Sequence, residues 1–194
     1  MKILDKKIWT YEQIDEIPEH SIILNGKEVE IMASSDIHAV WLGQIYLKLY
    51  KLYKDSYWIL IGEIGILISK EPLIILASDI AIVSKSKMPK LKGRILEIPP
   101  DLVIEIEKEK EEVKIEEKIN YYSSIGIKRQ IWVLLSKREV LVIEDNKSVI
   151  YRFDDEIEIL EGKKIKFSDI EKEVGLWELK RVLLEGENTK RFWN

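Results

Sequence analysis

The amino-acid sequence predicts a single α/β (α+β) domain in which helices flank a mixed β-sheet and a hairpin precedes the core. Its 194 residues suffice for one domain, and its apolar patterns follow the order helix, three strands, helix, strand. A hydrophobic fraction of 46% and a charged fraction of 34% are typical of a soluble globular protein. We expect the domain to span residues 1–194, with a core at about 34–144 and a C-terminal helical tail at about 168–194.

Two local signals predict the N-terminal elements. The segment Thr10–Gln13 has the spacing of a capping box and predicts a short helix, which Pro18 ends. Asn25-Gly26 is a strong signal for a tight turn between Ile22–Leu24 and Val29–Met32. These two segments are therefore expected to pair as a β-hairpin.

A long helix is predicted after the hairpin. Ser34-Ser35-Asp36 is typical of a helix N-cap, and the helix is expected to run to about Lys54. The residues of its apolar stripe, at helical spacing, are Ile37, Trp41, Ile45, Leu49 and Leu52.

The remaining elements complete the core. Tyr57–Ser69 is expected to be a strand that bends at Gly62 and Gly65, and Leu73–Val83 a strand that is apolar on both faces. The loop Ser84–Arg94 follows. The other predicted elements are a strand at Leu102–Glu107, a helix at Glu112–Ser124 followed by Gly126, strands at Gln130–Leu135, Val140–Glu144 and Val149–Phe153 with Asn146 in the last turn, and an amphipathic helix at Ile170–Glu185.

Composition limits the possible chemistry. The chain has no cysteine and only two histidines, His20 and His38, which excludes disulfides and thiolate metal sites and disfavours a histidine-rich zinc site. Oxygen ligands would favour a hard cation such as Mg²⁺ or Mn²⁺. The net charge of −4 argues against a general polyanion binder. No apolar run reaches the roughly 18 residues of a membrane helix, and no secretion signal is visible, so we expect a cytoplasmic protein.

Asp79 is the first candidate for chemistry. It lies in the strand predicted to be apolar on both faces, beside Ala77 and Ala81 on its own face. A buried carboxylate costs several kcal/mol unless it is compensated, and a metal ion is the simplest compensation. The alternative is that Asp79 ends the strand and accepts hydrogen bonds from backbone amides.

Two further residues complete the candidate set. Glu105 shares a strand face with Asp101 and Val103, which is also the pattern of a half-exposed strand with a solvated acidic side. Lys118 lies on the apolar stripe of the following helix, where it either meets a carboxylate or phosphate or extends toward solvent at the edge of the stripe.

Together these residues suggest metal-dependent hydrolysis of a phosphodiester. Two carboxylates on adjacent strands would hold Mg²⁺, which lowers the pKa of a bound water and neutralises a scissile phosphate. The lysine would orient that water or stabilise the pentacovalent transition state.

Four segments resemble a known family, and they read NGKEVEIM, SDIAIV, PPDLVIEI and KINYYSSIGIKRQIWVL. They are similar to the Uma-type restriction endonuclease family, a branch of the PD-(D/E)XK nuclease superfamily. The resemblance runs from about Thr10 to Ile143, and its most specific pattern is Lys118, Tyr122, Gly126 and Trp132. It implies a restriction-endonuclease-like core and a metal-dependent endonuclease that acts on nucleic acid, with DNA as the expected partner.

By position, the resemblance implies catalytic roles for Asp79, Glu105 and Lys118, and it adds Glu28 from the hairpin. Glu28 is otherwise an exposed strand residue near a turn. His38 matches a histidine at the start of the first long helix, where local hydrogen bonding is the alternative role.

The chain departs from the family pattern at two places. Ser78 replaces the usual proline before the aspartate, and the acidic and basic run 107–112 replaces a Ser-Pro-Ser-Thr-like segment. The motif lysine is absent because Glu107 occupies its position, so Lys108 and Lys110 are further candidates for the catalytic amine. These departures leave an alternative, a catalytically inactive nuclease-fold protein that binds nucleic acid or a partner protein.

A basic loop is the candidate nucleic-acid contact. The loop between the strands of Asp79 and Glu105 has no acidic residue between positions 84 and 94, so it is expected either to bind phosphates or to be a solvated connection. Its basic residues are Lys85, Lys87, Lys90, Lys92 and Arg94. A homodimer through the C-terminal amphipathic helix is a further possible assembly.

Overall fold

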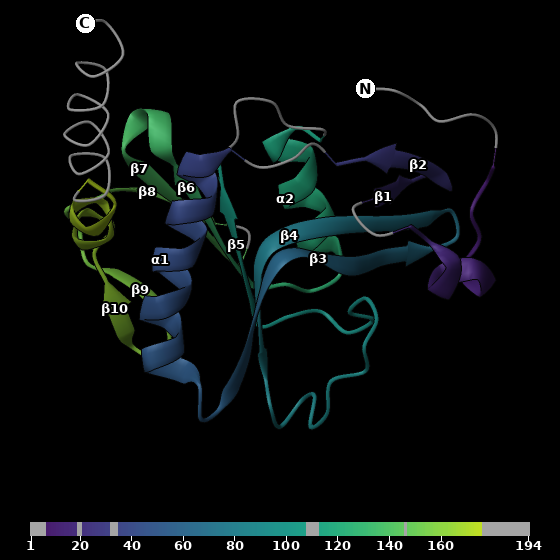
Figure 1. Cartoon of the computed structure of the whole chain (residues 1–194), viewed down its shortest axis with the longest axis horizontal. Helices are drawn as coiled ribbons and strands as arrows, with labels where there is room; N and C mark the ends of the chain where they lie inside the picture. Colours follow the sequence, from purple (N-terminus) through teal and green to yellow (C-terminus); the bar gives the residue numbers. More distant parts are fainter. Residues whose placement is uncertain (1–6, 19–20, 32–34, 108–112, 146, 176–194) are drawn as a thin grey trace, which may run out of the picture.

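The computed structural model describes residues 7–18, 21–31, 35–107, 113–145 and 147–175. A mostly antiparallel eight-stranded sheet has the strand order β2-β1-β4-β5-β6-β7-β8, and β3 pairs with β4 (Figure 1). This mixed architecture confirms the predicted fold class. The bounds of its elements in chain order are η1 Tyr11–Glu16, β1 Ser21–Leu24, β2 Lys27–Glu30, α1 Asp36–Tyr53, β3 Tyr57–Lys70, β4 Leu73–Ser84, β5 Leu102–Ile106, α2 Ile115–Ser124, β6 Arg129–Leu134, η2 Leu135–Lys137, β7 Glu139–Glu144, β8 Lys147–Arg152, β9 Ile157–Leu160 and β10 Lys163–Ile165.

The N-terminal elements agree with the turn signals in the sequence. The predicted short helix is the 3₁₀ helix η1, where the main-chain N–H of Thr10 donates to the side chain of Gln13. The hairpin β1–β2 turns at Asn25 and Gly26, whose φ angles are 52° and 76°. Positive φ at both positions is what a two-residue hairpin turn of type I′ requires.

Helix α1 begins where it was expected, with the Ser35 hydroxyl accepting a hydrogen bond from the main-chain N–H of His38. The predicted stripe is wrong at its first residue, because Ile37 is 48% exposed and the next residue, His38, is 3% exposed. The buried face of α1 comprises His38, Trp41, Ile45, Leu49 and Tyr53. A polar side chain therefore occupies one position of the core-facing stripe.

Strand β4 changes its partner along its length, and this positions Asp79. Ile75 in its first half pairs with Ile23 of β1, and Ile80 in its second half pairs with Ile104 of β5. Strand β3 runs beside β4 throughout, with a break in register that starts at Ile61. Asp79 lies between the segments that face β1 and β5.

The segment β5–α2–β6 forms the parallel part of the sheet. Strands β5 and β6 pair in parallel, and α2 connects them across one face of the sheet (Figure 1). Helix α2 ends before Gly126, whose φ of 86° agrees with its predicted stop position. The predicted start of this helix, Glu112, lies outside the described residues.

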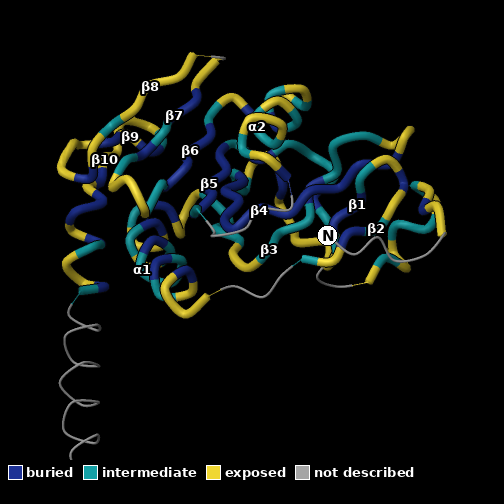
Figure 2. The backbone as a smooth tube through the Cα atoms, turned by 90° about the horizontal axis from the view of Figure 1, so that it is seen from above, coloured by how far each residue is buried: buried dark blue, intermediate teal, exposed yellow. Residues whose placement is uncertain are grey.

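Two apolar clusters cover the two faces of the sheet. Ile104 and Ile106 of β5 pack in the cluster that contains the buried face of α1. Val103 packs in the second cluster with Tyr122 of α2 and Trp132 of β6. Figure 2 shows β4, β5 and β6 as mostly buried chain between exposed helical surfaces. Polar side chains in these strands are therefore shielded from water.

The C-terminal part contains an unpredicted element. The hairpin of β9 and β10 forms a second, two-stranded sheet, and the chain is helical from 167 to 175. Phe167, Ile170 and Val174 join the cluster on the α1 side. The remainder of the predicted C-terminal helix and Asn146 lie outside the described residues. Within the described ranges, no helix is both long and apolar enough to span a bilayer.

Candidate active site

Asp79 is buried in the middle of β4, with 1% of its surface exposed. Its Oδ2 atom accepts a hydrogen bond of 2.8 Å from the main-chain N–H of Ile106. The same oxygen lies 3.1 Å from Nε2 of His38 on α1. Asp79 therefore accepts a hydrogen bond from a backbone amide, as one interpretation of the sequence expected. It does so from within β4 rather than at the end of the strand, and an imidazole lies beside it.

Glu105 lies on β5 near Asp79 of β4, close enough for the charge of Asp79 to raise its pKa. The β4–β5 ladder ends at the pair Ile80–Ile104, and Asp79 and Glu105 are the next residues beyond that pair on their two strands. Glu105 is only 5% exposed, so the interpretation of a solvated acidic strand face is wrong.

Helix α2 holds both oxygens of the Glu105 carboxyl group. The ammonium of Lys118 donates to Oε2 at 2.7 Å, and the hydroxyl of Tyr122 donates to Oε1 at 2.7 Å. The two donors are four residues apart and share one helix face. The Lys118 side chain is only 12% exposed, so it points to the sheet rather than to solvent.

The electrostatic environment of Glu105 is strongly perturbed. Burial raises the pKa of Glu105 to about 7, Lys118 opposes this rise, and the nearby charge of Asp79 adds to it. Burial, followed by the charge of Glu105, also raises the pKa of Tyr122 well above its usual range. Tyr122 is therefore a hydrogen-bond donor at neutral pH, and Glu105 exchanges a proton near neutrality.

This perturbed pKa predicts a pH dependence of stability. Between 4.5, the ordinary pKa, and about 7, the folded protein binds more protons at Glu105 than the unfolded chain does. The contribution of Glu105 to the free energy of unfolding should thus fall as pH rises, by at most about 1.4 kcal/mol per pH unit. In chelator-treated protein, urea unfolding from pH 5 to 8 should show this fall, and Glu105→Gln should remove it.

Glu116→Gln is the matched control, because Glu116 is an exposed carboxylate on the same helix. Its unfolding free energy should follow that of the unmodified protein at every pH. Parallel curves for the unmodified protein and Glu105→Gln would contradict a buried carboxyl group with a raised pKa.

The sequence pattern did not predict the contacts that the side chains of His38 and Tyr122 make with the two carboxylates. The sequence placed Tyr122 in the most specific pattern of the family resemblance without a role in the site, and it favoured local hydrogen bonding for His38. Only the main-chain N–H of His38 bonds locally, whereas its side chain lies against Asp79. Helical spacing could have indicated that the His38 side chain is buried, because His38 precedes Trp41 by three residues and so falls on the buried stripe.

Glu28 lies apart from the two buried carboxylates. Its carboxylate accepts hydrogen bonds from Trp9 Nε1 at 3.2 Å and from the Ser21 hydroxyl at 2.8 Å. Glu28 is opposite Ile23, and Ile23 is opposite Ile75 of β4, four positions from Asp79. That separation is two strand spacings across the sheet and about 13 Å along β4.

The basic loop also lies away from the carboxylates. It starts after Ser84, five positions beyond Asp79, which corresponds to about 17 Å of extended strand. Three of its basic side chains contact the protein itself. Lys85 donates to the Lys54 carbonyl, Lys87 donates to the Pro99 carbonyl, and Arg94 pairs with Glu97 at 2.7 Å.

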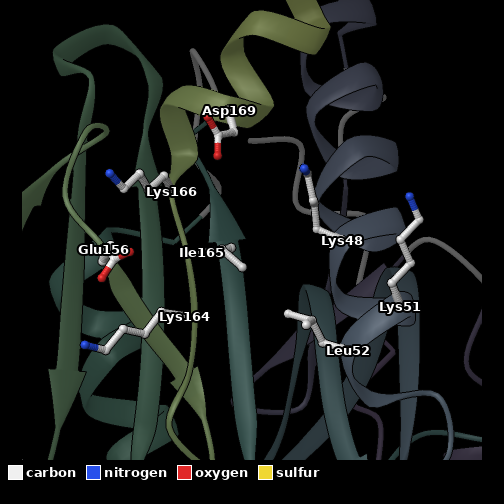
Figure 3. Close-up of a pocket in the computed structure, with 8 residues that line it drawn as sticks. All are labelled: Lys48, Lys51, Leu52, Glu156, Lys164, Ile165, Lys166 and Asp169. Atoms are coloured by element: carbon white, nitrogen blue, oxygen red, sulfur yellow. The ribbon is translucent and has the colours of Figure 1, made fainter.

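Lys87, Lys90 and Lys92 are exposed basic residues that line a cavity of about 350 Å³ in this loop. Another cavity, of about 310 Å³, lies between α1 and β10 (Figure 3). Its lysines diverge, since Lys48 and Lys51 extend along α1 while Lys164 and Lys166 point away from that helix (Figure 3). These side chains do not form a convergent anion site.

The departures from the family pattern have local structural roles. Ser78 is fully buried, and its hydroxyl donates to the Ile80 carbonyl at 2.9 Å, so β4 continues without the usual proline. Glu107, at the position of the missing lysine, accepts hydrogen bonds from the N–H and hydroxyl of Ser136 at 2.9 and 3.0 Å. Lys108 and Lys110 lie outside the described residues.

The donor set of the site fits a hard divalent cation. Asp79 and Glu105 are buried carboxylates on adjacent strands, and Mg²⁺ is commonly held by one or two carboxylates and several waters. Within the described part of the chain, no three histidine, aspartate or glutamate side chains form a ready metal cluster. Water or main-chain oxygens would therefore complete the coordination.

Comparisons with known proteins identify the family. A model of the Uma2 family, described as "Putative restriction endonuclease", matches residues 9–167. A solved structure of a putative nuclease of DUF820 from Anabaena variabilis has the same fold, with a TM-score of 0.72 and 14% sequence identity. The match covers 85% of this chain and 98% of the other. No curated protein matches the chain. Because the family model spans most of the chain and includes Asp79, Glu105 and Lys118, this protein belongs to the Uma2 restriction endonuclease family.

Proposed function

We propose that this protein is a metal-dependent endonuclease that hydrolyses phosphodiester bonds, with DNA as its substrate. The observation that carries the proposal is the presence of two buried carboxylates, Asp79 and Glu105, on adjacent strands, with the ammonium of Lys118 lying 2.7 Å from Glu105. Family membership supports a nuclease. The structural likeness supports the fold on which such a site is built.

Asp79 and Glu105 would hold Mg²⁺ or Mn²⁺. When bound, the ion would supply positive charge for the scissile phosphate and would acidify a water molecule. Tyr122 keeps the Glu105 carboxyl group oriented through its hydrogen bond to Oε1. The backbone N–H of Ile106 does the same for Asp79.

Lys118 supplies the amine that the β5 strand lacks. Its ammonium reaches the carboxylates from α2, because the residue lies one helical turn before Tyr122 on the same face. In the reaction it would orient the attacking water or stabilise negative charge on the phosphoryl oxygens. Glu107 cannot take this role, since it is acidic and holds Ser136.

A metal-dependent cleavage assay tests this proposal. Purified protein should cut plasmid and single-stranded DNA with Mg²⁺ or Mn²⁺, and it should stop cutting when a chelator is added. Binding of DNA with no cleavage under any of these conditions would instead support the inactive, nucleic-acid-binding alternative. The substitution of the motif lysine by Glu107 is the observation that favours that alternative.

Lys90 and Lys92 offer a separate test of DNA contact. Replacing both by alanine should lower the slope of log affinity against log salt concentration by about 2, because each phosphate contact contributes about 1. The control is Lys137→Ala with Lys147→Ala, two exposed lysines on other elements with the same total charge. Equal slopes for the two double variants would exclude Lys90 and Lys92 as phosphate contacts.

A further inference from the structure

His38 is a buried histidine whose side-chain nitrogens lack hydrogen-bond partners. The residue is 3% exposed, and within the part of the chain described, neither Nδ1 nor Nε2 has a donor or acceptor. Buried polar atoms are nearly always paired, so such an atom needs a physical explanation. An ion or a ligand facing the ring would provide one.

The contact between His38 and Asp79 is as short as an ion pair, but the ring and the carboxylate are not aligned as a hydrogen bond. Nε2 of His38 lies 3.1 Å from Oδ2 of Asp79, yet the ring does not direct an N–H at that oxygen. A protonated imidazole that only neutralised Asp79 would align its N–H with the carboxylate. The two atoms instead lie side by side.

That separation matches two neighbouring ligands of one cation. Ligands bound at about 2.1 Å and at right angles to each other lie about 3.0 Å apart. His38 is held at this position from α1, where its own N–H is fixed by the Ser35 hydroxyl and its ring lies on the buried helix face. The imidazole is therefore presented to the site by a rigid element.

We propose that His38 binds the same cation as Asp79, which gives the site a nitrogen ligand beside the Asp79 carboxylate. The proposal rests on the proposed function, because it requires an ion at Asp79. It changes the expected metal selectivity from that of an all-oxygen site. An imidazole ligand favours transition-metal ions such as Mn²⁺ over Mg²⁺ and Ca²⁺.

Pulsed electron paramagnetic resonance of the Mn²⁺-loaded full chain tests this assignment. Bound Mn²⁺ should show coupling to a ¹⁴N nucleus in the unmodified protein and in His20→Gln, since His20 is the other of two histidines in the sequence. His38→Gln should lose the coupling, and its Mn²⁺ affinity should fall by about 10-fold or more, while Ca²⁺ affinity changes less.

Isotope labelling keeps the test decisive even if His38→Gln fails to fold. In His20→Gln protein grown with ¹⁵N-histidine, the label is present only at His38. The ¹⁴N coupling should then be replaced by ¹⁵N coupling. If Mn²⁺ binding depends on Asp79 but the coupling does not change from ¹⁴N to ¹⁵N, His38 is not a ligand and the proposed metal site remains. Mn²⁺ binding that Asp79→Asn does not weaken would overturn both.

Discussion

Replacing Asp79 by asparagine should lower metal-dependent plasmid cleavage by about 10³-fold, the upper range for losing one preorganised electrostatic group. The physical reason is loss of the charge that attracts the cation to a buried position. The asparagine side-chain oxygen still accepts the hydrogen bond from Ile106, so the strand pairing should persist. Cleavage rates at saturating Mg²⁺ and Mn²⁺, with circular dichroism of both proteins, would check this result.

Asp101→Asn is the matched control for this change. Asp101 also accepts a backbone hydrogen bond, from Ser84 at 2.6 Å, and it lies immediately before β5. The same substitution removes the same charge from Asp101, but Asp101 is not one of the two carboxylates proposed to bind the cation. Cleavage by Asp79→Asn at the rate of Asp101→Asn would contradict the assigned role of Asp79.

Replacing Lys118 by methionine should lower the cleavage rate constant by about 10²–10³-fold while Mn²⁺ binding persists. Methionine keeps much of the side-chain length but removes the charge that contacts Glu105. Removing Lys118 frees the Glu105 carboxylate for a metal ion but also removes the charge that opposes the rise in its pKa, so Mn²⁺ binding should be retained at alkaline pH, where Glu105 is ionised. Single-turnover cleavage and calorimetric Mn²⁺ titration separate these two effects.

Lys128→Met controls for the loss of a lysine near the same helix, because Lys128 is exposed and follows α2. It should cut DNA at the unmodified rate. If Lys118→Met also does so, Lys118 is not the catalytic amine. If it loses Mn²⁺ binding together with cleavage, Lys118 serves to build the metal site rather than to act on the phosphate.

The parts of the fold with short-range signals were predictable from sequence. Asn25-Gly26 specifies its turn through positive φ angles, and the apolar run Leu73–Val83 marks a strand that is buried along its length. The hairpin of β9 and β10 was missed because its four- and three-residue strands are too short for a clear alternation. Its position depends on packing against distant parts of the chain, as with Ile165 in the α1-side cluster.

The candidate site was predictable to the extent that each residue breaks a local pattern. Asp79 in an apolar strand and Lys118 on an apolar helix stripe both signal a buried charge that needs a partner. The sequence could not show how Tyr122 and Lys118 divide the two oxygens of Glu105, because this depends on the placement of α2 over β5. Nor could it show that His38 of α1 lies against Asp79.

The resemblance to the family implied a role for Glu28 in the site, but it did not show where the Glu28 side chain lies in the fold. Its carboxylate is held by Trp9 and Ser21 at the β1–β2 edge. A position in a motif therefore does not by itself bring a side chain to the site.

Anomalous diffraction from crystals soaked in Mn²⁺ tests the central claim most directly. A manganese peak should lie within coordination distance of the carboxyl oxygens of Asp79 and Glu105, and no such peak should appear in Asp79→Asn crystals soaked under the same conditions. A peak only elsewhere on the protein, with Lys118 still bound to Glu105 and no ion beside Asp79, would contradict it.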